Sequence, residues 1–122
     1  SKVAYYCSCF ESLFSISTAE LKHRLSETIA FFLESESLIA RDIYEDLKLA
    51  YDLRSSVVHG SIISSKYSKN EFELLIKTVQ NCDNYIRLIF KKIMSNQNLL
   101  EIYRNGTNND LNNHLIELIF KK

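Results

Sequence analysis

The chain is 122 residues long, with 46% hydrophobic and 25% charged residues, which is the size and composition of one globular domain. It contains no proline and only two glycines, and because tight turns draw on these residues, a many-stranded barrel or sandwich is nearly excluded. Fifteen basic residues balance fifteen acidic ones, so a protein that coats nucleic acid or anionic membranes through bulk charge is disfavoured. We therefore expect a single all-α domain over residues 1–122, an antiparallel bundle of five to six helices.

The first two helices are predicted from the spacing of apolar residues. The first covers residues 2–14, where five residues recur at helical spacing: Val3, Tyr6, Phe10, Leu13 and Phe14. Ser17 and Glu20 match a capping box that opens a second helix, which ends near residue 33 and buries Leu21, Leu25, Ile29 and Leu33. Polar residues 34–37 then interrupt the pattern. Because the chain opens at Ser1 inside the first helix and without an initiator Met, we expect a domain excised from a longer protein.

A third helix is predicted over residues 38–58, and Gly60 follows it. Glycine just past a helix is the usual left-handed cap. On a helical wheel one stripe gathers the apolar residues Ile39, Ile43, Leu47, Ala50 and Val57. Arg54 falls in the middle of this stripe, where an unpaired charge is not expected.

The second half of the chain predicts three more helices. Ser68 and Glu71 match another capping box, which opens the longest helix over residues 69–94. Its apolar residues alternate by three and four, as in the seam of a bundle: Phe72, Leu75, Val79, Cys82, Ile86, Ile89 and Ile93. A short helix over residues 97–104, a turn at Asn105 and Gly106, and a last helix over residues 110–120 complete the chain.

Arg54 is the first candidate functional residue. A guanidinium within an apolar stripe must be paired, or must face a cleft or an interface, because burying a free charge is costly. Its planar set of donors matches the oxygens of a phosphate and never loses its charge. A structural alternative is an ion pair with Glu20 or Glu27 of the second helix.

His59, five residues after Arg54, is the second candidate. In a continuous helix it lies about 140° around the axis from Arg54, so the two side chains share a site only if the chain leaves the helix at Gly60. Imidazole transfers protons near neutral pH, and a helix C-terminus favours its charged form. A phosphate anchor and a proton-transfer group are what metal-free RNA cleavage requires. Alternatively, His59 is only a C-terminal cap of the helix.

The stretch from residue 54 to residue 70 is locally basic. It holds Arg54, Lys66 and Lys69 but no acidic residue, although the whole chain has a net charge of zero. Lys66 and Lys69 are therefore candidate substrate-binding residues beside the Arg54–His59 pair.

The remaining composition predicts no metal, no cofactor and no membrane span. The three cysteines, Cys7, Cys9 and Cys82, are odd in number and form no C-x-x-C pair, which indicates free thiols in a reducing compartment and hence a cytoplasmic location. No second ligand pair has zinc spacing, and no glycine-rich phosphate loop or nucleophile elbow occurs. No apolar run approaches the roughly 18 residues of a membrane span, and we expect no signal peptide.

Residues 51–60, YDLRSSVVHG, resemble the motif of HEPN domains, in particular the Apea-like HEPN branch. The signature of that family is an arginine, then four to six residues, then a histidine, with a polar residue directly after the arginine. Ser55 fills the polar position in this chain. Residues 17–32 are similar to the helix that precedes the motif in that branch, and the resemblance extends over residues 3–120.

The resemblance implies an all-α bundle that forms a homodimer, with the two motifs facing one another across a cleft. It also implies metal-independent endoribonuclease activity, often in toxin or antiphage roles. If the residues of this chain have the roles of the matching motif residues in the family, Arg54 binds the scissile phosphate and His59 transfers protons during attack of the 2′-hydroxyl. Ser55 then orients Arg54, His59 or the RNA. Tyr51 is expected to stack a base, to line the dimer cleft or to belong to the core. The implied partners are RNA, a second copy of the chain, and an antitoxin or a fused sensor domain.

Two other interpretations fit the same residues. The first is a non-catalytic HEPN module that binds RNA, a nucleotide or a protein partner, or that dimerises within a larger protein. The second is a plain helical scaffold, which predicts a monomer with Arg54 paired to a glutamate.

Overall fold

Helices account for nearly all of the chain that the computed structural model describes, residues 1–14, 21–59 and 69–120. Of residues 21, 22, 55–59 and 69–71 it describes only the backbone. In these parts six helices and no strand are found: α1 (Lys2–Phe14), α2 (Leu21–Leu33), α3 (Ala40–His59), α4 (Lys69–Ser95), α5 (Gln97–Asn105) and α6 (Asn108–Phe120). The expected all-α bundle is confirmed, and the predicted bounds of the first helix are those observed.

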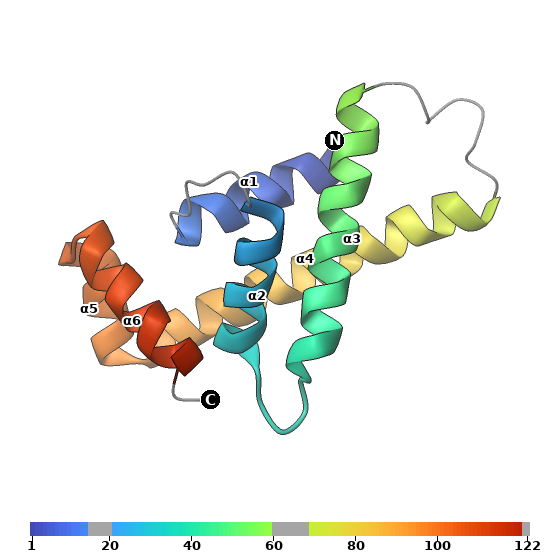
Figure 1. The fold of residues 1–122 in the computed structure, drawn as a ribbon. Coiled ribbons are helices and arrows are strands. Elements are labelled where there is room, and N and C mark those ends of the chain that lie inside the picture. The colour runs from blue at the N-terminus through green and yellow to red at the C-terminus, as the bar shows by residue number, and fades with distance from the viewer. Residues whose placement is uncertain (15–20, 60–68, 121–122) are drawn as a thin grey trace.

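The helices α2 and α3 form an antiparallel pair joined by residues 34–39 (Figure 1). The polar break predicted at residues 34–37 is confirmed, and reciprocal backbone hydrogen bonds between Ser35 and Leu38 close the loop. Ile39 is 62% exposed, so the prediction that it opens the buried stripe of the third helix is wrong. The physical reason is that α3 begins at Ala40, two residues later than the predicted start at residue 38, and Ile39 therefore belongs to the loop.

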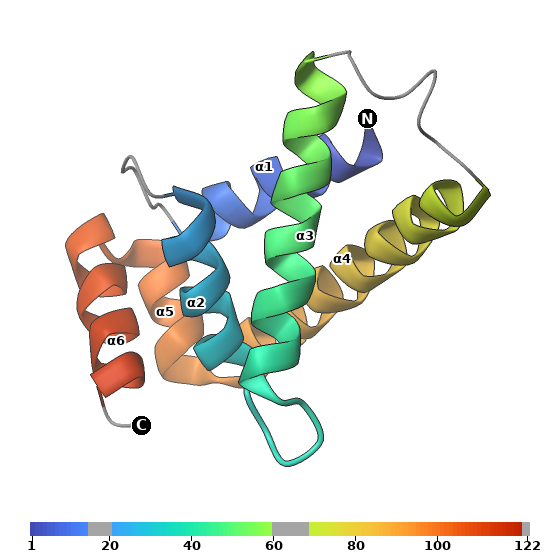
Figure 2. The ribbon, with the colours of Figure 1, turned by 45° about the vertical axis from the view of Figure 1, so that its right-hand side comes forward.

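The helices α1 and α4 lie side by side and run in the same direction (Figures 1 and 2). The antiparallel arrangement expected of the bundle thus holds for α2 and α3 but not for this pair. The hydroxyl of Tyr6 on α1 donates to Asp83 Oδ1 on α4 over 2.8 Å. Because α1 also packs against α3, the three helices α1, α3 and α4 all contact one another.

The core forms where the apolar faces of α1 to α4 meet. Val3, Cys7, Phe10 and Phe14 are buried along one side of α1. The ring of Phe14 packs edge-on against Phe32 of α2, with ring centroids 5.3 Å apart. The predicted core residues Leu25, Ile29, Leu33, Ile43, Leu47, Ala50, Cys82, Ile89 and Ile93 are all buried. The hydrophobic periodicity therefore predicted most of this core correctly.

The N-terminal end of α4 departs from the predicted seam. Phe72 is 58% exposed, although its spacing predicted a bundle position. The start of α4 and the last turn of α3 extend past the remaining helices, whereas the turns of α3 that carry Tyr51 and Arg54 pack against α1 (Figures 1 and 2). We call residues 55–59 of α3 and 69–77 of α4 the α3–α4 arm. The capping boxes predicted at residues 17–20 and 68–71 and the cap at Gly60 lie outside the described residues or side chains.

The C-terminal hairpin of α5 and α6 is fixed by local caps. Asn96 Oδ1 accepts from Leu99 N over 3.0 Å at the start of α5. Thr107 and Asp110 form a reciprocal capping box, with each side chain accepting from the backbone N–H of the other. With this capping box α6 begins at Asn108, two residues earlier than the periodicity predicted.

Candidate functional site

Arg54 extends the buried stripe of α3 by one turn. Ile43, Leu47, Ala50 and Tyr51 are buried along the same helix face, and they fix the helix against α1 and α2. The side chain of Arg54 is 30% exposed, so its guanidinium lies at the edge of the core and not in solvent. A half-buried guanidinium needs a partner, as the sequence predicted.

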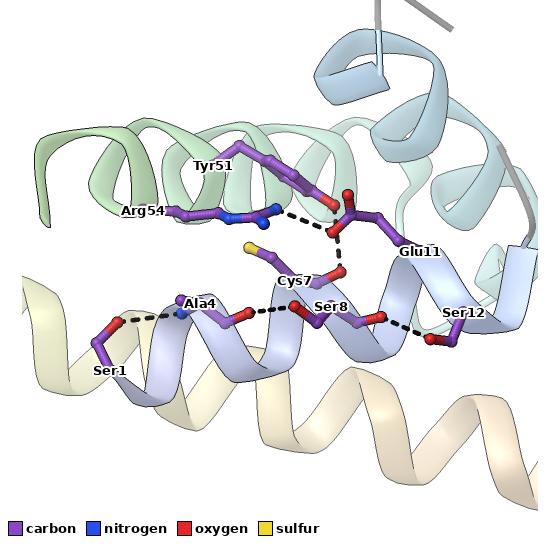
Figure 3. Close-up of polar contacts among 8 residues, drawn as sticks. All are labelled: Ser1, Ala4, Cys7, Ser8, Glu11, Ser12, Tyr51 and Arg54. Atoms are coloured by element: carbon purple, nitrogen blue, oxygen red, sulfur yellow. Dashed lines mark hydrogen bonds and ion pairs between the residues drawn. The ribbon is translucent and has the colours of Figure 1, made fainter. Parts of the chain in front are cut away.

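The partner of Arg54 is Glu11 of α1. Arg54 Nη1 donates to Glu11 Oε2 over 2.9 Å, and the Glu11 side chain is 25% exposed (Figure 3). The structural alternative predicted a glutamate, but on the second helix. Glu27 lies instead 3.7 Å from His23 Nε2, so the prediction of that partner is wrong, while Glu20 lies outside the described residues. The reason is that α1 crosses α3 at the turn that carries Arg54, whereas α2 packs along α3 as the neighbouring member of its pair.

Tyr51 and Cys7 complete the contact between α3 and α1. The hydroxyl of Tyr51 donates to the backbone oxygen of Cys7 over 3.3 Å, and Cζ of Arg54 lies 5.8 Å from the centroid of the Tyr51 ring (Figure 3). Tyr51 is only 8% exposed in this chain. From the sequence, Tyr51 is expected to stack a base, to line the dimer cleft or to belong to the core. Its low exposure favours the core, beneath the guanidinium of Arg54.

The electrostatics of this cluster keep Arg54, Cys7 and Tyr51 protonated at neutral pH. Burial acts to lower the pKa of Arg54, but the hydrogen bond and charge of Glu11 outweigh it and raise that pKa, so the guanidinium stays charged. Burial raises the pKa of the Cys7 thiol to about 11, and it also raises the pKa of Tyr51. Neither group loses a proton near pH 7, so neither acts as a base or nucleophile here. The cluster therefore offers one fixed positive charge, offset by one carboxylate.

The other predicted site residues are described in part or not at all. Ser55 and His59 belong to α3 and Lys69 is the first residue of α4, but their side chains are not described. Lys66 and Gly60 lie outside the described residues. Because α3 continues through His59, positions 54 and 59 are related by regular helix geometry, about 140° apart around the axis.

Glu11 and Cys7 are the two site residues that sequence reasoning did not identify. Both belong to α1, and they are four residues apart, so they lie on one face of that helix. Glu11 directly follows the buried Phe10, so it stands beside the apolar stripe of α1, from which a carboxylate can reach a cation on a neighbouring helix. The sequence does not tell which of the other helices brings that partner.

Metal-binding chemistry finds no support in the described chain. Among the described residues no group of three or more His, Cys, Asp or Glu side chains is arranged to hold a metal ion. Cys7, Cys9 and Cys82 are free thiols. His23 lies on the surface, with Nδ1 2.5 Å from the Tyr44 hydroxyl. No helix in the described ranges is both long and apolar enough to span a membrane.

Comparisons with known proteins identified no relative of this chain. No protein-family model, curated protein or solved structure matches the chain significantly. The residues and geometry of the Arg54 cluster are therefore the basis on which a function is assigned.

Proposed function

We propose that this chain is a metal-independent endoribonuclease of the HEPN type that acts as a homodimer. In this proposal Arg54 binds the scissile phosphate, and His59 transfers a proton during attack of the 2′-hydroxyl on that phosphate. The products are one RNA end with a 2′,3′-cyclic phosphate and one with a free 5′-hydroxyl. The proposal draws on the resemblance of residues 51–60 to the family motif together with the geometry around Arg54.

One observation carries the proposal: a guanidinium that is always charged sits at the crossing of α1 and α3, partly open to solvent. A core needs no such charge, since an apolar residue at this place on the stripe extends the packing at lower desolvation cost. A phosphate is the ligand that a planar, permanently charged donor group suits best. Position 59 lies five residues further along the same helix and about 140° around its axis, so the proposal needs the dimer cleft, in which the two motifs face one another, to bring an imidazole to the bound phosphate.

The homodimer is supported by the exposed apolar residues of α4. Phe72, Leu74 and Ile76 are all exposed near the start of this helix, on the α3–α4 arm, where the motif ends. Phe72 and Ile76 are four residues apart and share one face of α4, and exposed apolar residues grouped in this way mark an interaction site in a folded protein. A second copy of the chain that covers it brings the two motifs close together. An antitoxin or a fused sensor domain remains a prediction from the family resemblance.

The ion pair between Arg54 and Glu11 favours a second candidate, a non-catalytic HEPN module. In that role Arg54 joins α3 to α1, and the same surface binds RNA or a nucleotide without cleaving it. This alternative predicts binding without turnover. It also predicts that Arg54→Ala lowers the stability of the fold or of the dimer.

Cleavage of RNA in the presence of a metal chelator tests the proposal. We expect the protein to release fragments with 2′,3′-cyclic phosphate ends, and we expect Arg54→Ala and His59→Ala each to slow cleavage by about 100-fold or more. The matched controls are Arg104→Ala on α5 and His114→Ala on α6, which remove the same residue types elsewhere. Equal activity in all four variants contradicts the assigned roles, and RNA binding without any product favours the non-catalytic module.

A further inference from the structure

Glu11 contributes a negative charge directly beside the proposed phosphate-binding group. Its Oε2 atom lies 2.9 Å from Arg54 Nη1, and the two side chains come from different helices, α1 and α3 (Figure 3). Within the proposed ribonuclease, we propose that Glu11 is a positioning residue: it fixes the direction of the Arg54 guanidinium and weakens the hold of that group on a phosphate. This inference rests on the proposed function and adds a residue that the family motif does not include.

Both residues of the Glu11–Arg54 ion pair belong to helix segments that are packed into the core. On α1, the neighbours Cys7 and Phe10 are completely buried, which fixes the side of the helix that carries Glu11. On α3, Tyr51 lies one turn before Arg54, is buried, and holds α1 through its hydrogen bond to Cys7 O. An arginine side chain is long and has several rotatable bonds, so a fixed carboxylate removes much of its freedom. The guanidinium is therefore oriented before any ligand arrives.

The same carboxylate lowers the positive potential that a ligand meets. A guanidinium has five N–H donors, and Glu11 accepts from Nη1, so the pair presents oriented donors with little net charge. A phosphodiester, which carries one negative charge, is attracted by Arg54 and repelled by Glu11. By orienting Arg54, Glu11 raises the rate of the reaction step. By repelling the phosphate, Glu11 lowers the affinity for RNA, so it is expected to raise kcat and to weaken binding.

This opposition separates the inference from a purely structural role. If Glu11 only joins α1 to α3, its removal lowers stability and reduces binding and turnover together. If Glu11 positions Arg54, its replacement by the neutral isostere glutamine lowers turnover but tightens binding. The carboxylate-to-amide change keeps the size of the side chain and an oxygen acceptor near Nη1, so the fold has no reason to change.

The experiment compares Glu11→Gln with the parent protein on two probes. The first is a cleavable RNA oligonucleotide, which gives kcat and KM; the second is a 2′-O-methyl oligonucleotide of the same sequence, which gives Kd without cleavage. We expect kcat to fall about tenfold, because a weaker neutral hydrogen bond replaces the charge-assisted one that orients the guanidinium. We expect KM and Kd to fall up to about fivefold, because one repulsive charge is removed. Glu117→Gln, an exposed carboxylate on α6, is the matched control and is expected to change neither parameter.

Each outcome decides the inference. Unchanged kcat and Kd, or a weaker Kd together with a lower melting temperature, overturns it. If the parent protein cleaves no RNA, the proposed function fails, and the 2′-O-methyl probe then decides the inference alone. Binding that depends on Arg54 and becomes tighter in Glu11→Gln supports it, and binding that is absent or unaffected by Glu11→Gln overturns it.

Discussion

Tyrosine hydroxyls join neighbouring helices of this protein at the level of single residues. Tyr6 donates to Asp83 between α1 and α4, Tyr51 donates to Cys7 O between α3 and α1, and Tyr85 donates to Asp46 Oδ2 between α4 and α3 over 2.5 Å. Burial raises the pKa of Tyr85, and so does its hydrogen bond to Asp46, so the hydroxyl remains a donor at neutral pH. A ring that fills the core and a hydroxyl that reaches a polar partner suit tyrosine for these positions.

Two tyrosine-to-phenylalanine variants test this use of the hydroxyl. Tyr85→Phe removes a hydrogen bond to a carboxylate, and we expect it to lower the free energy of unfolding by about 1.5 kcal/mol. Tyr103→Phe is the matched control, because the buried hydroxyl of Tyr103 has no hydrogen-bond partner among the described residues. Its removal is expected to leave stability unchanged or to raise it by up to about 1 kcal/mol. Urea denaturation of both variants measures the difference, and equal losses in both contradict the argument.

At the scale of the element, the junction of α5 and α6 depends on a close backbone approach. Gly106 N donates to Ile102 O over 2.9 Å at the end of α5. A Cβ atom on residue 106 would lie 2.6 Å from that same carbonyl oxygen, although φ of −79° is open to any residue. The requirement for glycine here is thus one of space and not of backbone conformation.

The variant Gly106→Ala tests the close approach. The added methyl group forces the backbone at the end of α5 to shift, and we expect a loss of about 1–3 kcal/mol in the free energy of unfolding. Asn105→Ala, one residue earlier in the same turn, is the control and is expected to stay within about 0.5 kcal/mol of the parent protein. Thermal and urea unfolding measure both effects. A Gly106→Ala protein as stable as the parent contradicts the expectation.

Asp83 of α4, which is hydrogen-bonded to Arg87 on the same helix and to Tyr6 of α1, makes part of the stability dependent on pH. Asp83 accepts from Arg87 Nε and from the Tyr6 hydroxyl, and these two hydrogen bonds, that from Arg87 first, lower the pKa of Asp83. A carboxyl whose pKa is lower in the folded than in the unfolded state stabilises the fold above its unfolded value, near 4. That contribution is lost as the pH falls from there through the lower, folded pKa.

We therefore expect Asp83→Asn to reduce the acid sensitivity of the fold. Between pH 5 and pH 3 the free energy of unfolding should fall less steeply in this variant than in the parent protein. Tyr6→Phe, which removes the second hydrogen bond, is expected to give an intermediate slope. Urea denaturation at several pH values measures these slopes, and parallel curves for the three proteins disprove the role of Asp83. Glu117→Gln on α6 serves as the exposed control.

On the scale of the whole molecule, the α3–α4 arm differs from the rest of the fold. The arm extends past the remaining helices (Figure 2). Three of its apolar residues, Phe72, Leu74 and Ile76, are exposed, as are Ile116 and Phe120 on α6. The proposed site residues belong to this arm or to its base. A second copy of the chain is the occupant that the proposed function assigns to this surface.

Solution size tests the proposed dimer. The parent protein is expected to have twice the mass of the 14.2 kDa chain, and Ile76→Glu on the arm is expected to convert it to a monomer. The matched control is Ile116→Glu on α6, because Ile116 is similarly exposed (52% against 45%) but lies on another helix. Light scattering after size-exclusion chromatography gives the mass of each. A monomeric parent protein, or loss of the dimer in both variants, contradicts an interface on the arm.

The sequence predicted the helices and most of the core because both depend on local periodicity. Val3, Phe10 and Phe14 recur at helical spacing, and an apolar stripe must be buried in whatever partner it finds. Local information failed where a residue stands at an element end. Ile39 and Phe72 fit the periodicity, but the loop before α3 and the extended start of α4 leave both exposed.

By itself the sequence also determined that Arg54 needs a partner, since a charge within an apolar stripe is costly whatever the fold. Only the tertiary structure decided that this partner is Glu11. Residues 11 and 54 are far apart along the chain, and the crossing of α1 over α3 brings them within 2.9 Å. Such a crossing follows from how all the helix faces share one core, and several glutamates satisfy the local pattern equally well. The need for a counter-charge is thus a property of one stripe, whereas its identity is a property of the packed molecule.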